Sequence, residues 1–398
     1  MDWFKLKAEE FSEMYSEARV EFFLLDWGSG AQKIDVAIAT DNYPDIIYEN
    51  EPAIKKYASI GALEPIDSFL SESDMNDFGG RLEYGRVGNQ HYMIPYNTYA
   101  GTLHINRRIF REFGIDHLIP TDGSRSWTYD QFLAAAKAAT RDIDGDGIID
   151  VHGFGIHYGD SKGGYFRTNI MWNFGASLFN DQGTRAVINS QEGIKGLQFL
   201  LDLDKEHNVI PPGVIAYTRG QIRDLFLNGK VAMLPDTTGI KVAMDEAIRN
   251  EDIKSDEIEL WPVQMPHAPN CPAYNYAGGG GYAVLKQKDQ RKRELAMKFA
   301  MYLADEENIK AATMIGDFPA RESAASSSYE GQAYELYMLK LTANAHPDLS
   351  HPLYFDVRDT IETPIIQGVV ANQLTVEAGM AQIESEINAL LRRHDLYE

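Results

Sequence analysis

Four aspartates stand close together in one short segment of the chain. Asp142, Asp144 and Asp146 occupy alternate positions, a glycine follows them, and Asp150 ends the run. Carboxylate and carbonyl oxygens at this spacing suit a hard cation such as Ca²⁺, and the glycine permits the sharp turn that a calcium loop needs. With the carbonyl of Ile148 as a further oxygen, the segment predicts a structural calcium site.

The match to a calcium loop is partial. Position 12 of a complete EF-hand loop would be Gly153, where that motif carries glutamate. Asp150, at position 9, would have to close a shorter loop. The alternative interpretation is an acidic, solvated turn, and both interpretations give the segment a structural role because no general base accompanies it.

Motifs of several common catalytic sites are missing from the sequence. It contains no HExxH zinc motif, no GxxxxGK[ST] phosphate loop and no GxGxxG dinucleotide turn. The four glycines 278–281 precede a strand-like run rather than a helix, so they do not predict a phosphate cradle. Asp236, at the end of a strand-like run, is the best candidate for an acid in glycoside hydrolysis. Acceptance of hydrogen bonds from sugar hydroxyls is its favoured role, and we expect a protein that is not an enzyme.

Size, charge and cysteine content narrow the class of protein. The 398 residues are too many for one simple core, so two or three domains are expected. The net charge of −22 disfavours nucleic acid and anionic membrane surfaces as partners. With Cys271 as the single cysteine, no intrachain disulfide can form. No apolar run reaches the ~18 residues of a membrane span, and the chain shows no export signal at Met1.

Strand-like and helical segments alternate along the chain. Runs rich in β-branched or aromatic residues occupy 20–27, 45–49, 92–95, 102–106, 153–158, 230–234, 258–263 and 281–285. Between them lie segments with apolar residues three and four positions apart, as in 194–201 and 295–303. The residues Thr128 to Gln131 predict a capping-box start for a helix through Lys137. This alternation is typical of the α/β class with largely parallel sheets.

Eight segments, in order along the chain, resemble the sugar-binding family of extracellular solute-binding proteins, the maltose-binding-protein-like receptors of ABC importers. They are Asp41 to Tyr48, Gly61 to Ile66, Gly88 to Pro95, His104 to Phe110, Ser126 to Asp130, Phe226 to Met233, Gly278 to Ala304 and Phe318 to Arg321. The most specific is Phe-Leu-Asn-Gly-Lys-Val-Ala-Met at 226–233. The family often has a tryptophan after this segment, where this chain has Ile240 following Gly239.

The resemblance implies a two-lobed, type II periplasmic-binding-protein-like α/β fold with crossover hinge segments. Residues 1–108 and 263–316 would form the N-terminal lobe, and residues 109–262 and 317–398 the C-terminal lobe. By this resemblance, the family's first strand would be missing before the opening helix. The ligand would bind in a cleft between the lobes and close them by a hinge motion, for delivery to a membrane permease.

The resemblance also implies a sugar or oligosaccharide ligand, a monomer, and a place outside the cytoplasm, in the periplasm or as a cell-surface lipoprotein. Aromatic rings suit the apolar faces of a pyranose, and planar polar groups suit its hydroxyls. Candidates in loops after strand-like runs are Trp27, Glu49, Asn50, Tyr96, Asn97, Trp172, Asn173, Asp236, Thr237, Tyr276, Gly278 and Arg321. Arg321 has an alternative role as an interlobe salt-bridge partner. Alternative hypotheses for the function are a glycoside hydrolase or lyase, and a receptor for polyamine, iron or phosphate.

Overall fold

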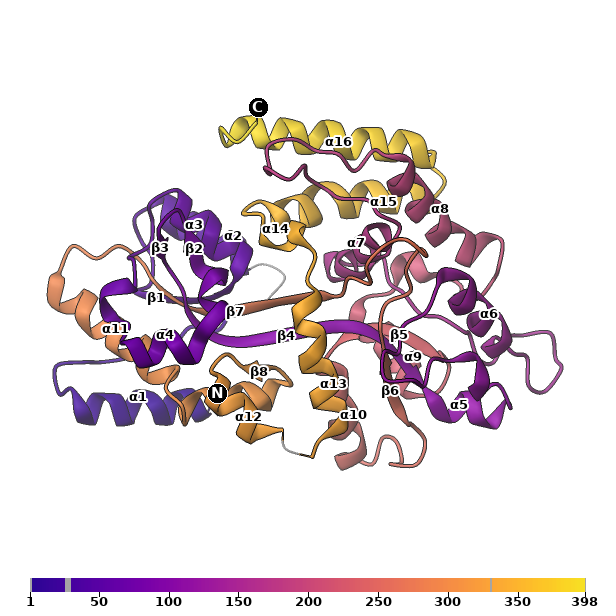
Figure 1. The fold of residues 1–398 in the computed structure, drawn as a ribbon, viewed down its shortest axis with the longest axis horizontal. Coiled ribbons are helices and arrows are strands. Elements are labelled where there is room, and N and C mark those ends of the chain that lie inside the picture. The colour runs from indigo at the N-terminus through magenta and orange to yellow at the C-terminus, as the bar shows by residue number, and fades with distance from the viewer. Residues whose placement is uncertain (1, 26–29, 330, 398) are drawn as a thin grey trace. The chain divides into compact units, whose positions relative to one another are not determined.

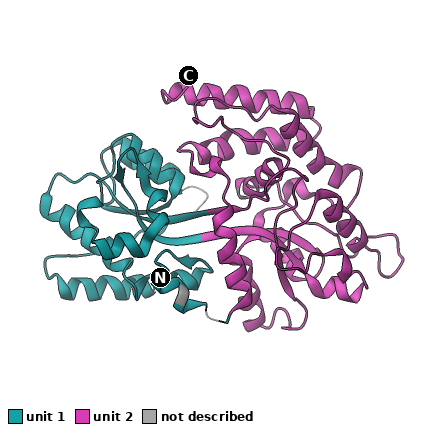
Figure 2. Ribbon diagram, viewed as in Figure 1, with its two compact units in different colours: residues 1–98, 278–331 teal, residues 99–277, 332–398 magenta. Residues whose placement is uncertain are grey.

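The computed structural model describes residues 2–25, 30–329 and 331–397, which form two compact units. Unit 1 comprises residues 1–98 and 278–331, and unit 2 comprises residues 99–277 and 332–398 (Figure 2). Each unit is a folded body and is described by itself. The mixed helix and strand content confirms the α/β class.

The boundaries of the units differ from the predicted lobes, which ended at residues 108, 262 and 316. The first two boundaries fall inside strands, after residue 98 within β4 (Ile94–Asn106) and after residue 277 within β7 (Tyr276–Val284). The third lies between residues 331 and 332, beyond the strand β8 (Phe318–Pro319). The predicted boundaries came from the family resemblance, which cannot place a boundary that lies inside a continuous strand of this chain.

Among its described residues, unit 1 contains six α-helices and the short strands that they surround (Figure 1). Its helices are α1 (Asp2–Met14), α2 (Gly30–Ala39), α3 (Glu51–Ser59), α4 (Glu72–Phe78), α11 (Gln290–Leu303) and α12 (Glu322–Ser328). Strand β1 (Ile46–Asn50) pairs antiparallel with β7, from Ile46 opposite Val284 to Asn50 opposite Gly280. β4 pairs antiparallel with β8, and β2 (Arg86–Val87) with β3 (Gln90–His91).

Unit 2 is the larger body. Its helices are α5 (Arg107–Glu112), α6 (Tyr129–Ala139), α7 (Gly164–Asn173), α8 (Gln191–Lys205), α9 (Arg219–Leu227), α10 (Gly239–Arg249), α13 (Ala333–Leu341), α14 (Tyr354–Asp356), α15 (Thr363–Val370) and α16 (Val376–Arg393). A π-helical turn, Val357–Glu362, joins α14 to α15. β4 pairs antiparallel with β5 (Met233–Thr237) and with β6 (Leu260–Val263).

These pairings correct the expectation of largely parallel sheets. In β1–β7, β4–β5, β4–β6 and β4–β8 the paired strands run antiparallel. The paired strands come from distant parts of the chain and not from successive strand–helix–strand units. The alternation of strand-like and helical segments in the sequence does not predict which distant strands pair. The predicted strand 153–158 is extended chain with single bonds, such as Phe154 N–H to the carbonyl of Val209 at 3.0 Å. Residues 20–25 likewise form no strand, and 26–27 lie outside the described residues.

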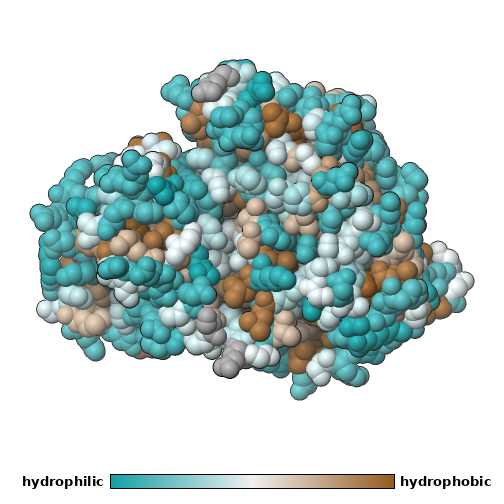
Figure 3. Space-filling view, in the orientation of Figure 1, coloured by the Kyte–Doolittle hydropathy of each residue, from teal (hydrophilic) through white to brown (hydrophobic). Residues whose placement is uncertain are grey.

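Local helix signals are confirmed. Thr128 caps α6, its side chain accepting from Gln131 N–H while the Gln131 side chain accepts from Thr128 N–H. α11 buries Phe299 and Leu303 in the core of unit 1, as its apolar spacing predicts. Among the described residues, no helix is long and apolar enough to cross a membrane. Hydrophilic side chains cover much of the face in Figure 3, in keeping with the acidic composition.

Candidate ligand-binding residues

In unit 1, polar side chains gather around the glycine run of β7. Tyr48 donates its hydroxyl to Oδ1 of Asn97 at 2.7 Å, and Nδ2 of Asn97 donates to Asp317 at 2.5 Å. A Cβ at Gly280 would lie 2.6 Å from the Tyr48 hydroxyl and 2.9 Å from Oδ1 of both Asn50 and Asn97. Glycine is therefore needed at 280, and the predicted Asn50 and Asn97 do come together.

The neighbouring Gly279 packs against an aromatic ring. A Cβ at Gly279 would lie 2.3 Å from the ring of Tyr84, so the ring packs directly on the strand backbone. Burial, with the charge of Glu51 as a smaller contribution, raises the pKa of Tyr84 to about 12. Tyr48, Tyr84 and Asp317 were not among the predicted site residues. Tyr48 lies within the predicted strand 45–49, directly before the predicted Glu49 and Asn50, and this position was the one usable signal.

Three other candidates in unit 1 have internal roles. Tyr96 is buried in the core, where its ring meets those of Tyr48 and Tyr282 edge-on. Glu49 is buried and accepts Asn50 N–H at 3.3 Å. Gly278 lies within β7. Trp27 lies outside the described residues.

Arg321 also serves unit 1 internally. Its guanidinium donates to Asp74 at 2.7 Å, to Asp77 at 3.2 Å and, through Nε, to the carbonyl of Ala304 at 2.6 Å. All of these partners belong to unit 1. The predicted roles in ligand binding and in an interlobe salt bridge are therefore not those of this structure, because three internal acceptors hold the side chain.

In unit 2, Asp236 is held by two arginines. Arg223 donates to its carboxylate at 2.7 and 2.9 Å, and Arg219 donates through Nε at 3.0 Å and also bonds the predicted Thr237 at 2.7 Å. Burial alone would raise the pKa of Asp236, but the charges of Arg219 and Arg223 outweigh burial and hold the pKa well below its usual range. Asp236 is 1% exposed, so neither the proposed acid role nor the sugar-hydroxyl role fits its surroundings.

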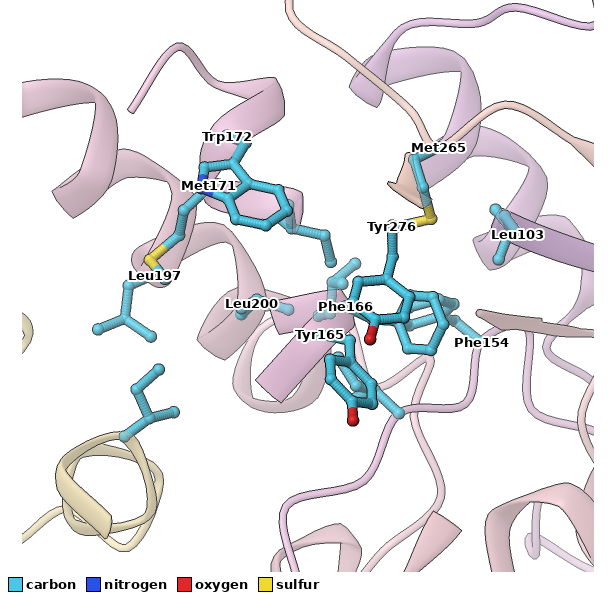
Figure 4. Close-up of a cluster of buried hydrophobic side chains, with 14 of the residues drawn as sticks. Leu103, Phe154, Tyr165, Phe166, Met171, Trp172, Leu197, Leu200, Met265 and Tyr276 are labelled. Carbon is cyan, nitrogen blue, oxygen red and sulfur yellow. The ribbon is translucent and has the colours of Figure 1, made fainter. Parts of the chain in front are cut away.

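Trp172 and Asn173 lie in the core of unit 2. Trp172 is fully buried in a cluster of apolar side chains (Figure 4). Its ring stacks on that of His346 with ring centres 4.5 Å apart, and its Nε1–H donates to Asp348 at 2.6 Å. Asn173 bonds the backbone of Tyr274 twice, donating at 3.1 Å and accepting at 2.9 Å. The prediction of a sugar-stacking ring at 172 is thus wrong for this structure, because chemistry alone does not separate a core tryptophan from a binding one.

Three tyrosines form a stack in unit 2. The ring of Tyr276 lies 4.1 Å from that of Tyr165 at 26°, and 5.3 Å from that of Tyr99 at 28°. Tyr165 comes from α7 and Tyr276 from β7, and Figure 4 shows their rings side by side. A Cβ at Gly101 would approach the ring of Tyr276 to 3.3 Å. The sequence analysis selected Tyr276, which precedes the predicted strand 281–285, and did not select Tyr99 or Tyr165.

One arginine borders this tyrosine stack, and a buried glutamate lies on the same helical turn as that arginine. Arg358, on the π-helical turn, lies 4.3 Å from the ring centre of Tyr165 and donates to Asp359 at 2.5 and 2.8 Å. Glu362, on the same turn, accepts from Thr168 at 2.5 Å. Burial raises the pKa of Glu362 to about 7, against the lowering effect of these neighbours. Aromatic faces beside planar charged groups are the pattern that carbohydrate recognition uses.

The acidic loop of unit 2 brings its first three aspartates together. Oxygen atoms of Asp142, Asp144 and Asp146 lie within 4.8 Å of one another. Asp142 accepts the N–H groups of Gly145 and Gly147 at 2.7 and 2.8 Å, and both glycines have positive φ, 78° and 91°. The loop is thus folded by its own carboxylates.

The remaining residues of the predicted metal set lie at the edge of this group. Asp150 braces the loop by accepting Ile143 N–H at 2.8 Å, and Ile148 is exposed. A cavity of about 390 Å³ beside the loop is lined by both Asp144 and Asp150, with Arg108 and Lys230 among its other residues. None of the predicted sugar-binding residues that the structure describes lines this cavity.

Solved structures of solute-binding proteins share this fold. A solute-binding protein of an ABC transporter from Thermotoga lettingae, solved with α-D-tagatose, superposes with a TM-score of 0.82 at 21% identity, over 98% of this chain and 96% of that one. Maltose-bound MalE3 of T. maritima superposes with a TM-score of 0.78 at 20% identity, over the same shares. These matches confirm the type II periplasmic-binding-protein-like fold.

Sequence relatives agree with the fold. A diacetylchitobiose binding protein, DasA, of Streptomyces coelicolor is 23% identical over 346 residues, which cover 83% of this chain and 73% of that protein. The model of the bacterial extracellular solute-binding protein family matches residues 1–310. The chain belongs to this family, which confirms the resemblance.

Proposed function

We propose that this protein is the substrate-binding receptor of an ABC importer and that its ligand is a sugar or oligosaccharide. The observation that carries the proposal is the match of residues 1–310 to the bacterial extracellular solute-binding protein family, whose fold this chain shares. The polar group around Gly280 in unit 1 supplies amide and hydroxyl oxygens of the kind that bond sugar hydroxyls. Relatives described as binding maltose or diacetylchitobiose support this ligand class.

The same proposal places the protein outside the cytoplasm, with a membrane permease as its partner. The extracellular solute-binding family supports this place. The protein binds its ligand as a monomer and without converting it. Asp236, the best candidate for a catalytic acid, already pairs with two arginines. This pairing supports a receptor over a glycoside hydrolase or lyase.

Replacement of Tyr165 by Ala will weaken ligand binding by about two- to tenfold, because each aromatic contact contributes roughly 0.5–1.5 kcal/mol beyond buried area. The ligand is first found by a thermal-shift screen of mono- and oligosaccharides, and affinity is then measured by calorimetry. Tyr397→Ala, at the exposed end of unit 2, is the control and will bind as the original chain does. A screen in which no saccharide raises Tm would overturn the proposal.

We propose further that residues 142–150 bind Ca²⁺ as a structural ion. The support is the convergence of Asp142, Asp144 and Asp146 and the oxygen-only donor set. Calorimetric titration of chelator-treated protein with Ca²⁺ will give a binding heat, which Asp144→Asn will remove and the exposed Asp181→Asn will not. A flat trace for the original chain contradicts this site.

A further inference from the structure

Two segments of unit 2 are fixed side by side at the start of α6. Thr128 and His267 form a parallel bridge, and His267 N–H donates to the carbonyl of Trp127 at 3.2 Å. Gln264 N–H donates to the carbonyl of Arg125 at 3.0 Å, and Trp127 Nε1–H donates to that of Gln264 at 2.9 Å. The side chains between these bonds are therefore held at a defined distance from each other.

Ser126 and His267 face each other in this frame. Oγ of Ser126 lies 2.8 Å from Nε2 of His267, and Nδ1 of His267 lies 2.9 Å from the carbonyl oxygen of Ala268. A carbonyl can only accept, so Nδ1 must carry the proton of the neutral ring. Nε2 is then the lone-pair nitrogen and accepts the hydroxyl proton of Ser126. Both side chains are partly exposed.

The start of α6 adds favourable electrostatics. The helix runs from Tyr129 to Ala139, and its first turn begins three residues after Ser126. Thr128 caps Gln131 N–H, and the earlier N–H groups of such a turn have no acceptor inside the helix. The partial positive charge of a helix N-terminus favours negative charge that develops on a nearby oxygen.

We propose that Ser126 is a nucleophile for acyl transfer from small activated esters, with His267 as its general base. Oγ attacks the ester carbonyl carbon while the hydroxyl proton passes to Nε2 of His267. The bond to the alcohol then breaks, the alcohol leaves with that proton, and the acyl group remains on Ser126. Water, deprotonated by the same nitrogen, releases the acid and restores the serine. This activity is separate from ligand binding and does not depend on the proposed receptor function.

Unit 2 contains a second serine–histidine contact with the opposite polarity. Ser177 Oγ lies 3.5 Å from Nε2 of His346, while Nδ1 of His346 accepts Asp348 N–H at 3.2 Å. With Nδ1 accepting, the ring proton sits on Nε2, which can donate to Ser177 but cannot take its proton. Ser177 is therefore an internal control that differs from Ser126 in tautomer and distance.

The test is the reaction of the full chain with a fluorophosphonate probe, followed by peptide mass spectrometry, with p-nitrophenyl acetate hydrolysis as a second readout. Ser126 will carry the adduct and Ser177 will not. His267→Gln will slow labelling of Ser126 by about 100-fold, the lower end of the range for general-base assistance, and S126A will abolish it. S177A will behave as the original chain does.

Two results would overturn this inference. One is labelling of Ser126 no faster than Ser177 in the unmodified chain, a comparison that needs no variant to fold. The other is an unchanged labelling rate in His267→Gln. Either result would leave the hydrogen bond as a simple tie between the two segments.

Discussion

Replacement of Asp236 by Ala will lower the free energy of unfolding by about 3 kcal/mol, the lower end of the range for breaking a buried ion pair. The carboxylate is buried and receives hydrogen bonds from both Arg219 and Arg223. Its loss leaves two guanidinium groups facing each other without a counter-charge. The lower end is expected because side chains of both arginines are partly exposed, 27% and 21%. Denaturation in urea, followed by circular dichroism, measures the change.

Asp245→Ala is the matched control for this prediction. Asp245 pairs with Lys241 on the exposed face of α10, four residues apart, and such pairs contribute about 0.3–0.5 kcal/mol. Equal losses in the two variants would show that the Asp236 pairs are no stronger than surface pairs. Because the folded state lowers the pKa of Asp236, the stability from this group is present above its unfolded pKa and is lost as the pH falls through the folded value.

Trp172→Ala will cost about 3–5 kcal/mol of stability, the usual range for removing a buried tryptophan. The ring is fully buried against His346, and its loss leaves a cavity in the core of unit 2. Trp172→Phe keeps most of the volume and loses only the Nε1–H bond to Asp348, so it will cost clearly less. Chemical denaturation of both variants gives the comparison.

Ligand affinity separates the core role of Trp172 from a binding role. Trp172→Phe, which remains folded, will bind the ligand with the affinity of the original chain, whereas Tyr165→Ala will not. A tenfold loss of affinity in Trp172→Phe, with stability unchanged, would show that Trp172 contributes to ligand binding and would contradict its core role.

Local signals in the sequence predicted local structure well. The capping box at Thr128 and the apolar spacing of residues 295–303 gave helices where the structure has them, because these signals act within one turn. Such local signals do not predict whether paired strands run parallel or antiparallel. That direction depends on which segments pair with β4, and its partners β5, β6 and β8 all lie more than 100 residues further along the chain.

The candidate site shows the same limit. The position of a polar residue after a predicted strand selected Asn50 and Asn97, which the structure brings together around Gly280. The same rule selected Asp236, and Arg321 was chosen for its place near the last crossover, but the charges of both pair with internal partners. Which polar groups are already satisfied depends on side chains far away in sequence, so spacing alone could not separate the two sets.

The glycine run in β7 constrains how this chain can change. At Gly279, Gly280 and Gly281 a single added carbon would come within 2.3, 2.6 and 2.2 Å of neighbouring atoms, at the last position those of the Ile94 carbonyl. The clash at Gly281 is with backbone, so glycine is required there whichever side chains surround the strand. At Gly279 and Gly280 the clashing atoms belong to the side chains of Tyr84, Tyr48, Asn50 and Asn97, so each of these glycines can change only together with its neighbours.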